Sequence, residues 1–484
     1  MAFAIDSKRV GFALLVVAVS ALLIWFGTGM FPTWPLLWFA PLPVLLFANR
    51  GSWLGSALVA LCAWLIGNLN LWHYLHSTIE VPLLACAAIF APRALVFAMA
   101  VLLYRALMMR RAWTSALLAF PATWVSFEYL LNLTSVHGTF GSLSYSQLNF
   151  LPFLQLASVT GPWGISFLLL LFSSTLATAV HLRSAQPKLA MRTLGAGLGV
   201  IAVVLIFGVV RLSLPQPGPR VKVGLIASDL PANIDIAADG AETARLFRDY
   251  AAQVGALAAQ GAQVIVLPEK LGVVVAPEAA GADGLFQSLA DKTGAEIIVG
   301  MVFVDAHVAY NQARLYTPRA PIESYDKHHM LPPFESQLKP GTTLTFLPAT
   351  QEKLGVAICK DMDFTPLSRQ YGETGVGLIF APAWDFTVDR VLHGHIAIMR
   401  GVEDGFSIAR SAKLGLLTVS DDRGRILAET QSNSAPFATL LADVPAVHDS
   451  TLYLLLGDWF AWLTLAILAF TLVQLIRLPR AQSH

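Results

Sequence analysis

Residues 353–363 read KLGVAICKDMD, and this stretch places a cysteine directly after a short run of small and β-branched residues. Such a run predicts a buried β-strand that ends at Ile358. A thiol at the end of a strand can be presented to a substrate by the turn that follows. Because a free cysteine is also often a small buried hydrophobe, this stretch alone leaves both roles open for Cys359.

Similar runs recur throughout residues 220–445 and alternate with stretches of helical periodicity. This alternation is typical of a layered α/β domain in which sheets are sandwiched between helices. The last strands, with a DDRG turn at 421–424, are predicted to form closing hairpins. The predicted strands are 221–227, 264–267, 296–304, 353–358, 376–383, 407–411, 414–420, 425–430 and 437–444, and the predicted helices are 241–260, 283–293, 365–373 and 390–404.

Two further polar residues follow apolar strands of this domain. Glu269 comes after VIVLP, and Lys327 lies in SYDKHHMLPPFE at 324–335. A carboxylate, an ammonium and a thiol are the groups needed for acyl transfer through a thioester. The carboxylate takes the thiol proton, and the ammonium stabilises the thiolate and the developing oxyanion.

The rest of the chain has the composition of a membrane protein. Of 484 residues, 56% are hydrophobic and 13% are charged, against about 25% charged in a typical soluble domain. The apolar residues are concentrated in a bundle at 1–213 and in a C-terminal span at 452–476, on either side of the 220–445 domain. A bilayer core needs about 20 apolar helical residues. We therefore predict about eight spans, near 10–26, 34–48, 53–75, 82–105, 114–132, 163–182, 192–212 and 452–476.

The short loops alternate in charge, which predicts the orientation in the membrane. Lys and Arg gather in one set of loops, whereas the opposite loops at 27–33, 76–81 and 133–162 contain neither. By the positive-inside rule, both termini face the cytoplasm and the α/β domain lies on the outer side. No small-residue cleavage site follows the first apolar run, so we expect it to be retained as a helix. The uncharged, aromatic-rich loop at 133–162 is a candidate lid or lateral entrance for a lipid.

Two charged residues are the clear cases of a charge well inside a predicted span, where an unpaired charge is costly. Arg93 and Glu128 could pair with each other inside the bundle, or Arg93 could bind a lipid phosphate that enters between the helices. The sequence leaves both interpretations open.

Several function classes are disfavoured by composition and motifs. The net charge of +1 disfavours nucleic acid as a partner, and three scattered cysteines disfavour a disulfide framework. No GxSxG, Walker A or GxGxxG pattern is present, so we expect no nucleotide or other cofactor. His393 and His395 are two residues apart and do not share a helix face, so we expect neither a metal site nor a catalytic histidine.

The order LPE, YDKxxxLPPFE, GVAIC resembles the Glu–Lys–Cys set of the nitrilase (carbon–nitrogen hydrolase) superfamily. Embedded among eight spans, it resembles the apolipoprotein N-acyltransferase family. The resemblance implies that Glu269 is the general base, Lys327 the oxyanion and thiolate partner, and Cys359 the nucleophile. It further implies supporting roles for residues that match the family's motifs, namely Glu335, Asp361, Trp384, Tyr310 and Asn311.

The implied activity is a two-step transfer in the bacterial inner membrane by a monomer. A fatty acyl chain passes from a phospholipid, through a Cys359 thioester, to the N-terminal amine of a lipoprotein's lipidated cysteine. Four positions depart from the family's pattern around the site, which leaves the amine acceptor open: Lys360, Asp361, Pro382 and Lys413. Three alternatives remain: a membrane-tethered amidase-like hydrolase, a paralogue that acylates a different amine, and a lipid-binding protein whose α/β domain has lost its activity.

Overall fold

The computed structural model describes residues 7–238, 240–348 and 352–479. Its internal contacts divide the chain into two units. We call the first the helical unit; it comprises Met1–Thr134, Gly141–Ser213 and Leu456–His484. The second, the α/β unit, comprises Ser135–Phe140 and Leu214–Leu455. The chain therefore enters the α/β unit briefly at 135–140 before its main passage through it.

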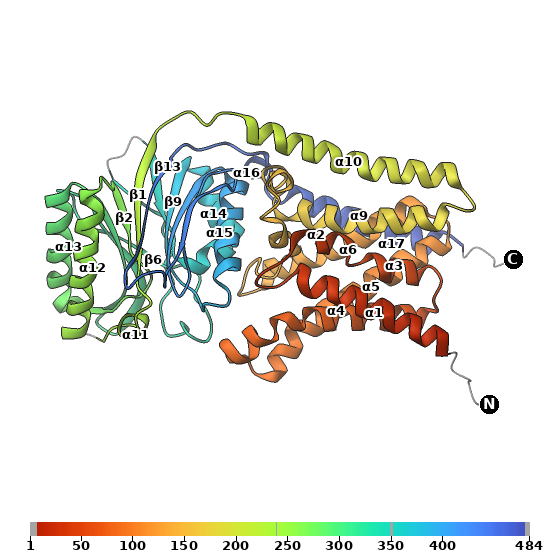
Figure 1. The fold of residues 1–484 in the computed structure, drawn as a ribbon, viewed down its shortest axis with the longest axis horizontal. Coiled ribbons are helices and arrows are strands. Elements are labelled where there is room, and N and C mark those ends of the chain that lie inside the picture. Colours follow the sequence, from red (N-terminus) through yellow and green to blue (C-terminus); the bar gives the residue numbers. More distant parts are fainter. Residues whose placement is uncertain (1–6, 239, 349–351, 480–484) are drawn as a thin grey trace. The chain divides into compact units, whose positions relative to one another are not determined.

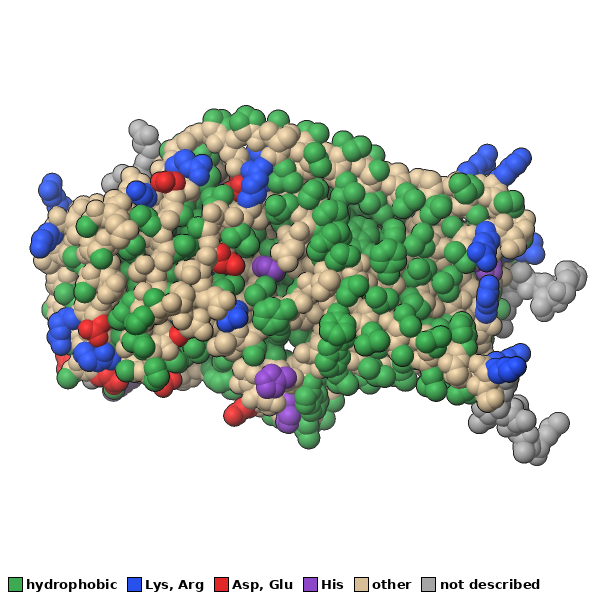
Figure 2. All heavy atoms as spheres, viewed as in Figure 1, with side chains coloured by type: hydrophobic (Ala, Val, Ile, Leu, Met, Phe, Trp, Pro, Cys, Tyr) green, Lys and Arg blue, Asp and Glu red, His purple; other side chains and the backbone are tan. Residues whose placement is uncertain are grey.

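The helical unit contains seven helices that are long and apolar enough to cross a membrane, within the described residues. They are α1 (Ser7–Gly27), α4 (Trp53–Asn68, continued by the 3-10 turn η1 at Leu69–Leu71), α5 (Leu83–Met109), α6 (Trp113–Thr134), α9 (Pro162–Leu182), α10 (Pro187–Ser213) and α17 (Trp459–Arg477). This confirms the expected membrane bundle. Apolar side chains cover this unit in Figure 2, and Lys and Arg side chains gather at one of its ends.

The predicted span at 34–48 is a broken helix. It consists of α2 (Trp34–Phe39) and α3 (Leu42–Ala48), which are separated at Ala40 and Pro41. A proline cannot donate to the preceding turn, so the helix restarts there. Ser173 Oγ donates to the Trp38 carbonyl at 2.6 Å, and Trp38 Nε1 donates to Gln147 Oε1 at 2.9 Å. Within the described residues, the seven long helices and this broken segment together fit the prediction of about eight spans.

The loop at 133–162 is built of short helical turns rather than extended chain. Apart from Ser135–Phe140 it belongs to the helical unit, where it forms η3 (Leu143–Gln147), α7 (Leu151–Leu154) and α8 (Ala157–Thr160). Trp459 Nε1 of α17 donates to the Val159 carbonyl at 2.7 Å, and Trp163 Nε1 donates to Asp458 Oδ1 at 2.9 Å. The last span is thereby fastened to this loop. The remaining short element is η2, a π-helical turn at His73–Thr78.

The α/β unit contains two sheets. Seven strands form one sheet in the order β13-β1-β2-β4-β5-β6, with β3 beside β4, and six form the other in the order β12-β11-β10-β9-β8-β7. The strands are β1 (Arg220–Ala227), β2 (Val264–Val266), β3 (Val273–Val275), β4 (Glu296–Asp305), β5 (Val308–Tyr316), β6 (Glu323–Asp326), β7 (Thr345–Phe346), β8 (Lys353–Val356), β9 (Val376–Trp384), β10 (Ser407–Lys413), β11 (Leu416–Ser420), β12 (Ile426–Gln431) and β13 (Ala438–Pro445).

Helices cover the outer face of each sheet (Figure 1). Helices α12 (Ala241–Ala259) and α13 (Ala279–Thr293) pack on one sheet, and α14 (Thr365–Glu373) and α15 (Arg390–Asp404) pack on the other. A hydrophobic core lies between the two sheets and is formed by alternate strand residues such as Leu225, Val356 and Phe380. Alternation follows because successive strand side chains point to opposite faces. The four-layer sandwich confirms the predicted fold class. The short elements are α11 (Pro231–Ile234), η4 (Ala276–Glu278), η5 (Cys359–Asp363) and α16 (Leu452–Leu456).

The sequence-based assignment of the closing strands is partly wrong. Strands β10, β11 and β12 do form an antiparallel meander, with residues 421–424 as the turn. Strand β13, however, pairs antiparallel with β1 in the other sheet, with Ala227 opposite Ala438. Strands β1 and β13 are far apart in the sequence, and no local sequence pattern indicates that two such strands pair. Local patterns did not predict strands β3, β5 and β7, and they indicated β6 only as a strand before Lys327, without its bounds.

Candidate active site

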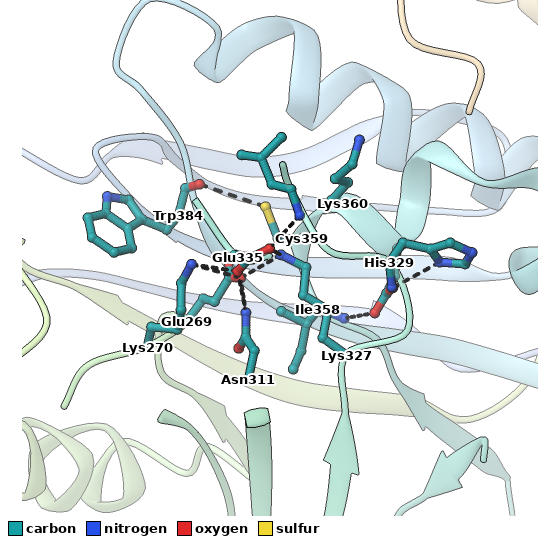
Figure 3. Close-up of polar contacts among 12 residues, drawn as sticks. Glu269, Lys270, Asn311, Lys327, His329, Glu335, Ile358, Cys359, Lys360 and Trp384 are labelled. Carbon is teal, nitrogen blue, oxygen red and sulfur yellow. Dashed lines mark hydrogen bonds and ion pairs between the residues drawn. The ribbon is translucent and has the colours of Figure 1, made fainter. Parts of the chain in front are cut away.

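The three residues of the predicted Glu–Lys–Cys set lie at the ends of strands from both sheets. Glu269 follows β2 and Lys327 follows β6 in one sheet, whereas Cys359 follows β8 in the other and opens the 3-10 turn η5. The sandwich brings these strand ends together, and their side chains converge in Figure 3. Gly300 of β4 allows the close approach, because a Cβ there would lie 2.2 Å from the Pro268 carbonyl oxygen.

Lys327 is clamped between two carboxylates. Its Nζ lies 2.8 Å from Glu269 Oε1 and 2.8 Å from Glu335 Oε2, and all three side chains are at most 2% exposed. Asn311 Nδ2 donates to Glu269 Oε1 at 2.6 Å and to Glu335 Oε1 at 2.8 Å. The buried charges are thus paired and hydrogen-bonded, as burial requires. The ammonium is held in one position.

Lys270 is a fourth charged member of this cluster, and sequence reasoning missed it. Its Nζ lies 2.5 Å from Glu335 Oε1. Glu335 thereby bridges two lysines. Tyr310, by contrast, precedes Asn311 on β5 and so points to the opposite face of the strand; it lies under Lys339, whose Nζ is 5.8 Å from its ring centroid. Asn311 therefore belongs to the Glu–Lys cluster, whereas Tyr310 contacts Lys339.

The backbone at Cys359 is strained. Its φ is +45°, a left-handed value that is costly for a residue other than glycine. Asp361, fully buried two residues later, accepts hydrogen bonds from the backbone N–H of Ile358 at 3.1 Å and from the Tyr325 hydroxyl at 2.7 Å. It also accepts from the backbone N–H groups of His328 and His329. The predicted supporting carboxylate therefore ties the nucleophile turn to the segment that follows Lys327.

Neighbouring charges set the protonation states in this cluster. Burial alone would lower the pKa of Lys327, but Glu269 and Glu335 hold it well above its usual range. Burial would raise the pKa of Glu335, yet Lys327 and Lys270 lower it to about 2. Burial and the charge of Glu269 raise the pKa of the Cys359 thiol. His393, Lys327 and Arg410 lower it, but they do not cancel the rise. The thiol consequently needs a base.

Trp384 ends β9 beside the nucleophile. The Cys359 thiol donates to its backbone carbonyl at 3.7 Å. Two lysine side chains lie over its ring: Lys413 Nζ is 3.6 Å and Lys270 Nζ is 5.3 Å from the ring centroid. Lys413, one of the positions that depart from the family pattern, is fully buried and donates to the Lys270 carbonyl at 3.2 Å. Pro382, another such position, lies within β9, paired with Ser411 of β10.

Segment Ser135–Phe140 packs on η5. The backbone N–H and the hydroxyl of Thr139 both donate to the Asp363 carbonyl, at 3.0 and 2.8 Å. Lys360, which follows the nucleophile, lies 3.2 Å from His137 Nδ1 and 3.5 Å from Asp363 Oδ2. Lys360 is another position that departs from the family pattern. Its side chain joins the nucleophile turn η5 to this segment through His137.

The two intramembrane charges lie elsewhere, in the helical unit. Arg93 Nη1 donates to the Ile89 carbonyl at 2.9 Å, and a Cβ at Gly141 would lie 3.4 Å from its other terminal nitrogen. Glu128 accepts from the Leu143 backbone N–H at 2.9 Å and from the Ser142 hydroxyl at 3.3 Å. Both side chains therefore reach the start of the 141–162 loop, and lipid binding by either stays a prediction.

The absence of a catalytic histidine stays an expectation, but the structure places one histidine close to the nucleophile. Of the two histidines on α15, His393 comes close to Cys359, and a ring nitrogen of His393, the Cys359 sulfur and an Asp385 oxygen all lie within 4.8 Å of one another. His395, two residues on, is not part of this group. The spacing between the two histidines along the helix does not indicate which of them lies near Cys359, and in the structure His393 does.

Comparisons with known proteins divide the chain in the same way. Residues 20–175 match the apolipoprotein N-acyltransferase N-terminal domain, and residues 225–445 match the carbon–nitrogen hydrolase domain. The chain is 27% identical over 383 residues to an apolipoprotein N-acyltransferase from Geobacter metallireducens, covering 73% of each chain. It is 25% identical over 387 residues to one from Vibrio vulnificus, covering 72% of this chain and 74% of that one.

Two solved structures are also similar. One is a nitrilase-superfamily member from Saccharomyces cerevisiae, with 19% identity, a TM-score of 0.41 and coverage of 50% of this chain and 95% of that one. The other is an amidase from Nesterenkonia sp., with 19% identity, a TM-score of 0.41 and coverage of 50% and 94%. Because the two domain matches follow each other along one membrane chain, this protein belongs to the apolipoprotein N-acyltransferase family of the carbon–nitrogen hydrolase superfamily.

Proposed function

We propose that this chain moves a fatty acyl chain from a phospholipid, through a thioester on Cys359, to the N-terminal amine of a lipoprotein's lipidated cysteine. One observation carries the chemistry: Lys327 is held by Glu269 and Glu335 at the strand ends where the Cys359 thiol lies on a strained turn. The name shared by the curated relatives supports the donor and acceptor.

In the first half-reaction, Glu269 takes the thiol proton and the thiolate attacks the ester carbonyl of the phospholipid. Lys327 stabilises the oxyanion with an ammonium that its two carboxylates have already oriented. The C–O bond then breaks, and the lysophospholipid leaves with the proton returned by Glu269. An acyl thioester on Cys359 remains.

In the second half-reaction, the acceptor amine attacks the thioester and the C–S bond breaks. Glu269 takes a proton from the attacking nitrogen, and the thiolate is released to be protonated again. Water would compete with the amine, so a pocket that excludes water distinguishes a transferase from a hydrolase.

The protein is a membrane protein, and its relatives are bacterial. We infer that it resides in the inner membrane, with both termini cytoplasmic and the α/β unit on the outer side. The terminal residues 1–6 and 480–484 themselves lie outside the described part of the chain. Both substrates are lipids, so apolar spans give them a lateral route to the thiol.

A second candidate function is transfer of the acyl chain to a different amine, and one observation favours it. Lys413 and Lys270 place two ammonium groups on the ring of Trp384, directly beside the nucleophile. The sequence departs from the family pattern at Lys413, and an amine at this position changes the surroundings in which the acceptor must bind.

Intact-protein mass spectrometry of the chain purified from membranes, with a Cys359→Ser variant as control, tests the proposal. We expect a fatty-acyl mass increment on the parent that hydroxylamine removes and that the variant lacks. Glu269→Gln, correctly inserted, should form the thioester at least about a hundredfold more slowly, because a general base is missing.

Adding acceptor then separates the classes. A diacylated lipopeptide should discharge the thioester and gain the acyl chain as an amide. Discharge into water at the same rate with and without the lipopeptide would instead support a hydrolase. If no increment forms in the presence of phospholipid, the proposed chemistry is wrong.

A further inference from the structure

His393 lies beside the nucleophile in a position that the Glu–Lys–Cys mechanism does not use. It belongs to α15, and its side chain is only 11% exposed. One of its ring nitrogens, the Cys359 sulfur and an Asp385 oxygen lie within 4.8 Å of one another. The ring of Phe140 meets it edge-on, with centroids 5.9 Å apart. The imidazole is thus enclosed next to the sulfur.

Carboxylates surround the other sides of this imidazole. Nδ1 lies 3.5 Å from Asp385 Oδ1, and Nε2 lies 3.5 Å from Asp389 Oδ2. Asp363 of η5 adds a third negative charge at longer range. Burial alone would lower the pKa of His393, but Asp389, Asp385 and the neighbouring thiol hold it well above its usual range. At neutral pH the ring therefore carries a positive charge.

Cysteine, histidine and aspartate are also metal ligands, so a metal site must be weighed. Arg410 donates to both oxygens of Asp385, at 2.8 Å from Nη1 and 2.5 Å from Nη2. A guanidinium in this bidentate contact occupies the carboxylate and brings a positive charge against the position of a cation. The donor set favours a protonated histidine over a metal ion.

We propose that His393 is the charged partner of the Cys359 sulfur, stabilising it electrostatically in each step in which the sulfur is negative. The sulfur is negative twice: after Glu269 has taken the thiol proton, and again when the C–S bond of the thioester breaks. His393 donates no proton in either step; its charge offsets that of the thiolate. Asp385, fixed by Arg410, and Asp389 hold the ring in place and keep it protonated.

This role complements that of Lys327. Lys327 is shared between Glu269 and Glu335, so much of its charge is already compensated. In the proposed mechanism Lys327 stabilises the carbonyl oxygen of the substrate, whereas His393, on α15, lies near the sulfur. Burial and the charge of Glu269 both raise the pKa of the thiol, and His393 is the first of the groups that oppose this rise.

The test is the pH profile of Cys359 alkylation by iodoacetamide in the full-length protein, followed by mass spectrometry of the Cys359 peptide. In His393→Gln we expect the alkylation midpoint to move up by at least one pH unit. Alkylation at neutral pH should then be about tenfold slower, because one pKa unit is a tenfold change in the thiolate fraction. His393→Asn is the second variant if His393→Gln does not fold.

His395→Gln is the matched control. His395 is on the same helix and is also buried, and burial lowers its pKa to about 4, so it carries no charge at neutral pH. Its replacement should leave the alkylation profile where it is. An unchanged midpoint in folded His393→Gln or His393→Asn would overturn the proposal, as would an equal shift in His395→Gln. Faster alkylation of the parent after adding a chelator would show a metal site instead.

The inference rests on Cys359 being the nucleophile of the proposed function, but the two fail separately. Alkylation requires neither phospholipid nor amine, so it measures the state of the thiol alone. An acyl-enzyme together with an unshifted profile would refute the role of His393 and leave the transfer reaction standing. A shifted profile without any acyl-enzyme would refute the transfer reaction and leave the thiol's partner standing.

Discussion

Two buried lysines of the site behave in opposite ways because their neighbours differ. Lys327 lies between Glu269 and Glu335, which raise its pKa well above the usual range. Lys413 is equally buried, but it contacts an aromatic ring and a backbone carbonyl, and Lys270 repels it. Burial and this repulsion lower the pKa of Lys413 to about 7. The residue type alone does not predict the charge state of either lysine.

The lowered pKa of Lys413 predicts a pH-dependent penalty on stability. An unfolded lysine has a pKa of about 10.4, so between about pH 7 and pH 10 the unfolded chain holds one proton more than the folded chain. Stability therefore rises with pH across this window, by up to about 1.4 kcal/mol per pH unit from this group. Below about pH 7 both states are protonated and the contribution is constant.

Lys413→Met should remove this penalty. We expect the melting temperature of the variant in detergent to exceed that of the parent most at pH 6 to about pH 7, and the gap to narrow toward about pH 9. Lys353→Met, at an exposed lysine, is the control and should show a gap that does not change with pH. A constant gap for Lys413→Met as well would mean that Lys413 is not titrating in this range.

At the scale of the element, the turn η5 depends on a segment that is far from it in sequence. The Thr139 hydroxyl donates to the Asp363 carbonyl, and the preceding residue, Gly138, adopts a φ of +52°. A Cβ on Gly138 would lie 2.4 Å from the Asp363 carbonyl oxygen. Glycine is required here both by the left-handed backbone and by the close approach.

Gly138→Ala should therefore displace Ser135–Phe140 from the turn that carries Cys359. We expect thioester formation to fall about tenfold or more, since a clash and a left-handed alanine each cost roughly 1–2 kcal/mol. Gly240→Ala is the matched control, because Gly240 has φ +79° but no atom within 4 Å of the added Cβ. Equal losses in both variants would trace the effect to backbone strain in general and not to this contact.

For the whole molecule, the charge asymmetry of the loops makes the orientation testable. Ser77 lies in the loop at 76–81, which lacks Lys and Arg and which we propose to be on the outer side. Ser184 lies in a basic loop, and both serines are exposed. In a background with the native cysteines replaced, Ser77→Cys should react with a membrane-impermeant maleimide in spheroplasts. Ser184→Cys should react only after permeabilisation. Labelling of Ser184→Cys in sealed spheroplasts would reverse the proposed topology.

Much of the fold could be predicted from local patterns. Long apolar runs specify the membrane helices, and the four amphipathic helices of the α/β unit begin and end within a few residues of their predicted positions. Strand β5 was missed although it carries Asn311, and β13 was assigned to the wrong neighbour. Strand partners are long-range contacts, and no local periodicity encodes them.

The candidate site shows the same division. Glu269, Lys327 and Cys359 could be named from strand ends, because a strand end is a local property that places a side chain at the edge of a sheet. Glu335 and Asp361 came only from the resemblance to the family's motifs. Lys270, His393 and the anchoring of η5 by Ser135–Phe140 could not be predicted, because each depends on which distant segments pack together.

Composition and short-range periodicity are sufficient to predict the membrane character, the layered α/β domain and the groups available for acyl transfer. Which charges meet depends instead on the packing of distant segments. This packing puts Lys327 between two carboxylates, Lys413 on a tryptophan ring and His393 against the nucleophile. The reason is physical: the pKa of a buried group is set by neighbours a few ångströms away in space, and these neighbours come from strands and helices that are far apart in the chain.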